Sequence, residues 1–94
     1  MRRVLVTYNV KPGKAKDLVL ELEKSEAAAN VRKEDGCLEY NYYLPVNDDD
    51  KALLVELWEN EESHKAHLAG PNRAPLGEIK SKYVNDQKIE VIDN

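Results

Sequence analysis

A short polar turn between two strand-like segments constrains the fold of this chain more than any other feature. Residues 45–51 begin with a proline and consist mostly of Asn and Asp, and they separate two runs rich in apolar and aromatic residues, 37–44 and 52–58. So short a link allows only an antiparallel pairing of the two runs. The aspartates lack the ligand spacing, the glycine and the closing glutamate of a calcium loop, so we interpret the segment as a solvated hairpin turn.

Helical patterns lie on both sides of this hairpin. Residues 14–34 contain no proline or glycine, and their apolar side chains recur at three- and four-residue steps, which predicts one long amphipathic helix. After the hairpin, Asn60 is a suitable N-cap for a helix that ends before Gly70. Residues 72–84 have helical spacing around a proline and a glycine, and they predict a second, bent helical piece.

Two further strands complete the pattern. Residues 3–10 are almost all apolar, and residues 87–92 alternate between polar and apolar side chains. The order is therefore βαββαβ, which predicts a ferredoxin-like α+β fold with one four-stranded antiparallel sheet and the helices on one of its faces. Residues 3–10 and 52–58 are apolar at both parities, so we expect the other face to be covered by a second subunit in a homodimer. We expect residues 1–94 to form a single domain.

Composition argues against several classes of function. The net charge is −4 with both signs mixed along the chain, so no basic stripe suggests a nucleic-acid partner. No segment approaches the length of a membrane span, and the apolar run at the N-terminus breaks too early for a signal peptide. The single cysteine, Cys37, fits a reducing compartment. We therefore expect a cytoplasmic protein with no membrane partner.

Three motifs span nearly the whole chain. Val-Lys-Pro-Gly-Lys occupies residues 10–14, Asp-Gly-Cys-Leu-Glu-Tyr occupies residues 35–40, and Glu-Leu-Trp-Glu-Asn-Glu-Glu at residues 56–62 leads to Ala-His-Leu-Ala-Gly-Pro at residues 66–71. In this order and spacing they resemble the antibiotic biosynthesis monooxygenase (ABM) family of the dimeric α+β barrel superfamily. The resemblance implies a homodimer whose two sheets face each other, with a small apolar pocket in each subunit between sheet and helices.

The reactions of similar family members are diverse. They include cofactor-free oxygenases of anthrone-type phenols and quinols, haem-degrading enzymes, and an isomerase of a phosphorylated sugar. The haem-degrading branch uses an asparagine, a tryptophan and an iron-binding histidine at positions that here are Leu5, His67 and Gly77. Many members also have a histidine where this chain has Asn72. The resemblance therefore argues against haem degradation, and we expect no cofactor.

His67 is the candidate catalytic residue. His64, His67 and Leu68 share a helix face that should point toward the sheet. A neutral histidine in an apolar pocket can act as a general base near neutral pH, and in a cofactor-free oxygenase it would remove a phenolic or activated C–H proton. The alternative is that His67 only packs or caps, and we interpret His64 as structural. The His-x-x-His pair specifies no third ligand, so no metal site is predicted.

Further residues are predicted to shape the substrate pocket. Trp58 supplies a large wall and an N–H donor, and strand alternation allows only one of the two adjacent tyrosines near residue 42 to line the pocket. By the resemblance, Leu5 marks the pocket-facing parity of the first strand, so its neighbours of the same parity could orient a substrate hydroxyl or dioxygen. The predicted substrate-binding residues are Thr7, Asn9, Tyr42, Trp58 and Tyr83. Glu56 needs a partner if it is buried, and we expect one across the subunit interface.

Together these features predict a dimeric, cofactor-independent monooxygenase that acts on a small quinol or anthrone-type aromatic compound. Two alternatives stay open. One is an isomerase of a small carbonyl compound that uses the same base and consumes no oxygen. The other is a non-catalytic small-ligand-binding or stress-related barrel protein.

Overall fold

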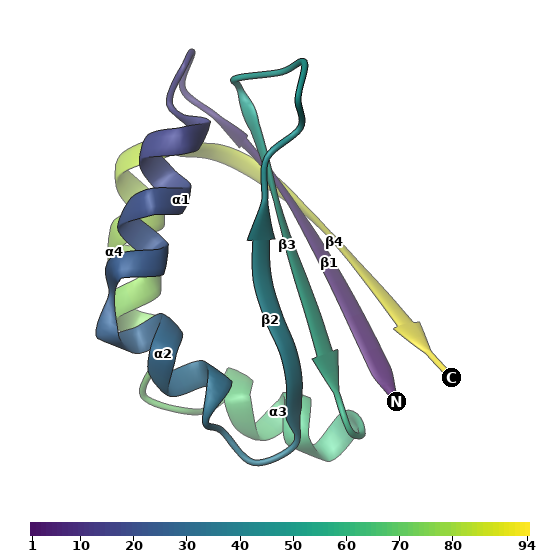
Figure 1. Ribbon diagram of the computed structural model, residues 1–94. Helices are drawn as coiled ribbons and strands as arrows, with labels where there is room; N and C mark the ends of the chain where they lie inside the picture. Colours follow the sequence, from purple (N-terminus) through teal and green to yellow (C-terminus); the bar gives the residue numbers. More distant parts are fainter.

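The computed structural model describes residues 1–94 and confirms the βαββαβ order. The strands pair in the order β2-β3-β1-β4, and every pair is antiparallel. The helices lie on one side of this sheet (Figure 1), as the ferredoxin-like prediction required. The elements are β1 (Arg2–Val10), α1 (Ala15–Lys24), α2 (Glu26–Arg32), β2 (Cys37–Tyr43), β3 (Lys51–Trp58), α3 (Glu61–Leu68), α4 (Arg73–Tyr83) and β4 (Val84–Asp93).

The prediction of one continuous helix over residues 14–34 is wrong in one respect, because the helix is divided into two at Ser25. Ser25 has extended backbone angles, φ −73° and ψ 143°, and its hydroxyl accepts a hydrogen bond from the backbone N–H of Ala28. Serine caps a helix N-terminus in this way more readily than it continues a helix. Two helices result, and α2 departs from the direction of α1 toward the lower end of the sheet (Figure 1).

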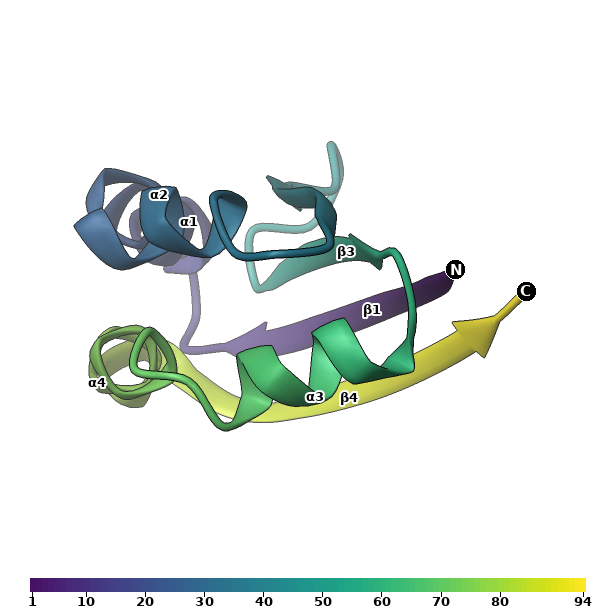
Figure 2. The same cartoon turned by 90° about the horizontal axis from the view of Figure 1, so that it is seen from below.

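The C-terminal part of the chain is more regular than predicted. Residues Arg73–Tyr83 form a single helix, because Pro75 lies in its first turn, where a backbone N–H has no helical acceptor. Helix α4 runs directly into β4, and Figure 2 shows α1 and α2 as one helical pair and α3 and α4 as another. Strand β4 is longer than predicted, since its pairing with β1 extends from Val84 to Asp93.

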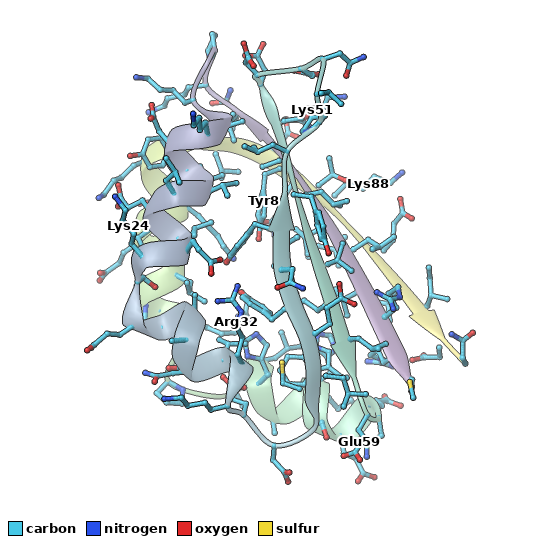
Figure 3. The ribbon with its side chains drawn as sticks, in the orientation of Figure 1. Tyr8, Lys24, Arg32, Lys51, Glu59 and Lys88 are labelled. Atoms are coloured by element: carbon cyan, nitrogen blue, oxygen red, sulfur yellow. The ribbon has the colours of Figure 1, made fainter.

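The core lies between the sheet and the helices. Every second residue of β1 is buried on this side, and Tyr8 lies between the sheet and the helical layer (Figure 3). The largest fully buried side chains include Trp58, Tyr8, Leu18 and Leu22. Burying one large apolar side chain contributes about 1.5–3 kcal/mol to folding, so this layer holds the helices on the sheet.

The opposite face of the sheet has no helix over it. Its central strands carry Leu5, Leu53, Val55 and Leu57 there, all half-exposed. None of the helices combines the length and apolar character that crossing a bilayer requires.

Candidate active site

A cavity of about 590 Å³ lies between the sheet and the α3–α4 pair. Apolar side chains of β1, β3 and β4 form one wall, and His64 and His67 project into it from α3. Such a volume accommodates a small aromatic molecule. The cavity therefore has the place and the size that the family resemblance implied for a pocket.

His67 is held by a carboxylate from a distant part of the chain. Its Nδ1 lies 2.9 Å from Oε1 and 3.2 Å from Oε2 of Glu34, which follows α2. A carboxylate only accepts hydrogen bonds, so Nδ1 carries the imidazole proton and Nε2 keeps its lone pair. This tautomer leaves Nε2 as the nitrogen able to accept a proton.

Nε2 of His67 is open to the cavity. It makes no hydrogen bond, and no buried side-chain nitrogen or oxygen in the protein lacks a partner, so Nε2 is not sealed in the core. The indole of Trp58 stacks on the imidazole with ring centroids 4.9 Å apart and an interplanar angle of 27°. The edge contact with Tyr40 has a centroid distance of 6.1 Å. These rings fix the direction in which Nε2 points.

The carboxylate of Glu34 is itself positioned by two contacts. The amide of Asn72, just before α4, donates to Oε2 of Glu34 at 2.7 Å. The loop that carries Glu34 is tied to the β3–α3 connection, because the backbone N–H of Glu59 donates to the carbonyl of Gly36 at 2.8 Å. Gly36 has φ +81°, and a Cβ at this position would overlap the side chain of Ser63 in α3. Only glycine permits this approach, which brings Glu34 beside α3.

Glu56 has its partner within its own strand. Trp58 Nε1 donates to Oε1 of Glu56 at 2.9 Å, so the cross-subunit partner expected from the sequence is not needed. The carboxyl group is buried, and this burial raises its pKa above the ordinary value, against the opposing effects of the indole N–H and of His67. Glu56 is therefore a buried acid in the cavity wall, on the strand that also carries Trp58.

His64 has the opposite tautomer to His67. Its Nδ1 lies 3.4 Å from Nη1 of Arg2, and because arginine only donates, Nδ1 of His64 must be the unprotonated nitrogen. Burial and then the positive charge of Arg2 lower the pKa of His64. The neutral ring of His64 therefore faces the cavity with its lone pair directed away toward Arg2, and it is less suited than His67 to accept a proton from a ligand.

The sequence profile of the antibiotic biosynthesis monooxygenase family matches residues 1–74. The chain belongs to this family. It is 37% identical over 52 residues to the uncharacterized protein YjcS of Bacillus subtilis, a match that covers 55% of this chain and about half, 48%, of that protein.

Solved structures share the ABM fold over the whole length. A crystal structure from Deinococcus radiodurans has a TM-score of 0.84 and 26% identity, and covers 100% of this chain and 92% of that one. A conserved protein from Methanosarcina mazei has a TM-score of 0.85 and 22% identity, with coverage of 99% and 91%. At 22% identity, the similarity to the Methanosarcina protein shows only that the two share a fold.

In this ABM chain, three of the predicted site residues lie at or near the cavity. His67 lines it, and Trp58 packs behind the imidazole. Tyr42 packs beside Tyr40, to whose hydroxyl its own hydroxyl donates at 3.4 Å. Trp58 and Tyr42 therefore support cavity residues and do not line the cavity themselves.

The other predicted substrate-binding residues lie elsewhere. Thr7 and Asn9 point to the face of β1 opposite Tyr8, and Asn9 donates a hydrogen bond to Asp86. Tyr83 donates to Oε1 of Glu21 at 2.8 Å and is likewise absent from the cavity wall. The resemblance to the haem-degrading branch suggested that the odd-numbered residues of β1 face the pocket. In this chain the even-numbered residues, Tyr8 among them, face the helices and the cavity.

Sequence reasoning missed Glu34 and the role of Asn72. Glu34 lies 33 residues before His67, in a charged stretch where nothing distinguishes it from its neighbours. Asn72 stood out only as a replacement for a histidine. No group of three or more His, Cys, Asp or Glu side chains is arranged to hold a metal ion.

Proposed function

We propose that this protein is a cofactor-independent monooxygenase that oxidises a small aromatic quinol or anthrone, with His67 as the general base. The observation that carries the proposal is the His67–Glu34 pair, in which Nδ1 is bound to a carboxylate and Nε2 is free at a cavity. A base held in this way contributes about 10²–10⁴-fold to a proton transfer.

The reaction of an anthrone illustrates the chemistry. Nε2 of His67 accepts a proton from the activated CH₂ group, and the resulting carbanion passes one electron to dioxygen. The two radicals combine to form a C–O bond, and His67 returns its proton to the peroxide. Loss of water then leaves a carbonyl, so one oxygen atom enters the product and the other leaves as water.

The surroundings of His67 support this role. The Glu34 carboxylate stabilises the imidazolium that forms when Nε2 takes the proton. Apolar side chains such as Val6, Leu54 and Leu76 also line the cavity, and beside them an aromatic ring is favoured over water.

Oxygen uptake tests the proposal. Purified protein is mixed with a panel of anthrones and quinols in the presence of a chelator, and oxygen consumption is compared between wild type and His67→Ala. The proposal expects uptake by wild type and loss of about 10²-fold or more in the variant. Equal rates would refute it.

The same preparation distinguishes the two alternatives. Turnover of a carbonyl compound without oxygen would identify an isomerase, and ligand-induced thermal stabilisation without turnover would favour a binding protein.

We also propose that two copies pair through the helix-free face of the sheet. Support comes from its half-exposed central apolar residues, Leu5, Leu53, Val55 and Leu57, which would remain in contact with water in a monomer. A homodimer of this kind is what the family resemblance implies for two facing sheets.

A further inference from the structure

We propose that Arg73 and Lys80 form an anion subsite in the cavity, which binds the carboxylate of an aromatic acid whose ring lies in the apolar part of the same cavity. With this subsite, the substrate of the proposed monooxygenase would be an aromatic acid. The inference rests on the proposed function only in that it places the ring of the acid beside His67. Binding of the acid requires no turnover.

Both cations lie on the cavity face of α4. They are seven residues apart, which is close to two helical turns and about 10 Å along the axis. Leu76 and Gly77 lie between them at three- and four-residue steps, and all four residues line the cavity. The helix therefore presents a positive charge at each end of one continuous stretch of cavity wall.

Neither cation has a carboxylate partner in the protein. The side chain of Lys80 makes no hydrogen bond or salt bridge, and its ammonium lies 5.2 Å from the centroid of the Tyr8 ring. Arg73 donates only to the carbonyl of Leu68, at 3.3 Å. The chain has 18 acidic residues against 14 basic ones, so unpaired cations are not explained by a shortage of acids.

Several other cations of this protein have a carboxylate partner, and those that lack one, such as Lys24, are exposed. Arg2 binds Asp93 at 2.8 Å, Arg32 binds Glu23 at 2.7 Å, and Lys82, two residues from Lys80 on α4, binds Glu21 at 2.6 Å. Lys80 in contrast is half-buried, and this burial lowers the pKa of its ammonium. A partly desolvated charge without a partner gains more from a bound anion than a solvated one does.

The only carboxylate that lines the cavity acts on these cations at a distance and forms an ion pair with neither. Glu56 accepts the indole N–H of Trp58 and makes no salt bridge with Arg73 or Lys80. With Glu56 ionised, Arg73 and Lys80 leave one net positive charge, which a monoanionic carboxylate neutralises and a dianionic phosphate exceeds. A carboxylate is therefore the anion that we assign to the subsite.

An apolar body fits between the cations and the sheet. Nothing lies within 4 Å of the position that a Cβ of Gly77 would occupy, so the wall is open between Arg73 and Lys80. Across the cavity, Ile89 and Val91 of β4 are 56% and 47% exposed. A ring that covers them would remove apolar surface from water while its carboxylate reaches α4.

A matched pair of probes tests the subsite by calorimetry. Naphthalene carboxylate and naphthalene carboxamide have the same ring and nearly the same shape, and differ in charge. We expect the carboxylate to bind about tenfold more tightly, because a charge-assisted hydrogen bond in a half-buried site is of that magnitude. Lys80→Met and Arg73→Gln should each reduce this preference severalfold, and Lys80→Arg should largely retain it.

Lys24→Met is the matched control, since Lys24 is an exposed lysine on the outer side of α1, away from the cavity (Figure 3). It removes one positive charge and should leave the preference unchanged. Equal binding of the two probes, or binding of neither, would overturn the subsite. A preference that survives both Lys80→Met and Arg73→Gln would do the same, and tighter binding of naphthyl phosphate would overturn the assignment to a carboxylate.

The outcomes separate the subsite from the enzymatic activity. Selective binding of the carboxylate, without oxygen uptake on any quinol, would refute the monooxygenase and support the subsite. Oxygen uptake with neutral quinols, without any preference for the carboxylate probe, would support the monooxygenase and refute the subsite.

Discussion

Nδ1 of His67 lies 2.9 Å from the Glu34 carboxylate, across the junction between α3 and the loop after α2. The His67 side chain is 6% exposed and that of Glu34 is 21% exposed, so the pair is largely shielded from water. The carboxylate selects the tautomer of the imidazole, and the second nitrogen is directed to the cavity.

Glu34→Gln tests this pair. The amide retains the size of the side chain but removes the charge that stabilises an imidazolium, and a charge-assisted hydrogen bond contributes about 1.5–3 kcal/mol. If His67 is the base, turnover should fall by about tenfold to a hundredfold. Oxygen uptake measures the effect, with Asp35→Asn, an exposed neighbouring acid, as the control. Equal activity of the two variants would contradict a role for Glu34.

Gly36→Ala should destabilise the protein more than Gly13→Ala does. Both glycines have positive φ, +81° and +73°, so both substitutions incur a backbone cost of about 1–2 kcal/mol. Only at Gly36 would the added Cβ also overlap Ser63, since nothing lies within 4 Å of Gly13. Urea unfolding of the two variants isolates this packing effect. Equal losses of unfolding free energy would show that the loop and α3 are not closely packed.

Glu56→Gln should change stability in a pH-dependent way. Burial raises the pKa of Glu56 from its ordinary value of 4.5, so the folded state holds the proton more tightly than the unfolded state. Wild type therefore loses stability as the pH rises from about 4.5 through the folded-state pKa. The amide cannot ionise and can still accept from Trp58, so the variant should gain stability relative to wild type over this range. Urea unfolding at a series of pH values would show the gain, and a difference independent of pH would contradict it.

Gly77→Ala should stabilise the fold. The residue lies in the interior of α4 with no atom near the added methyl group, and Ala is favoured over Gly in a helix by about 0.5–1 kcal/mol. Gly77→Leu would place a larger side chain in the cavity and should weaken binding of the naphthalene probes. Thermal unfolding and calorimetry measure the two effects, and unchanged affinity in Gly77→Leu would place the ligand elsewhere.

Val55→Lys tests the proposed dimer. Val55 is half-exposed at the centre of the helix-free face. A lysine there would be buried and unpaired in a dimer interface, which costs free energy, but would remain in water in a monomer. Light scattering should report a dimeric mass for wild type and a monomeric mass for the variant. Leu20→Lys, at an exposed apolar position on α1, should not alter the mass. A monomeric wild type would refute the dimer.

The chain order of strands and helices was predictable because its signals are local. The short turn at residues 45–51 requires an antiparallel hairpin, and glycines or prolines separate most of the other elements. The break at Ser25 was missed because a serine between good helix formers is a weak signal until its hydroxyl is seen to cap α2.

His67 could be selected as a candidate from its type and its position on one face of a helix. Its partner could not, because Glu34 reaches it only through the fold: Ser25 redirects α2, and Gly36 allows the following loop to approach α3. The pocket-facing parity of β1 was instead taken from the resemblance at Leu5. Alternation within the strand favours the other face, because Val4, Val6, Tyr8 and Val10 are all apolar and their odd-numbered neighbours are mostly polar. The sequence by itself determined the order of the elements and one candidate base. The tertiary structure decided which groups surround that base, because the contacts join residues far apart in the chain.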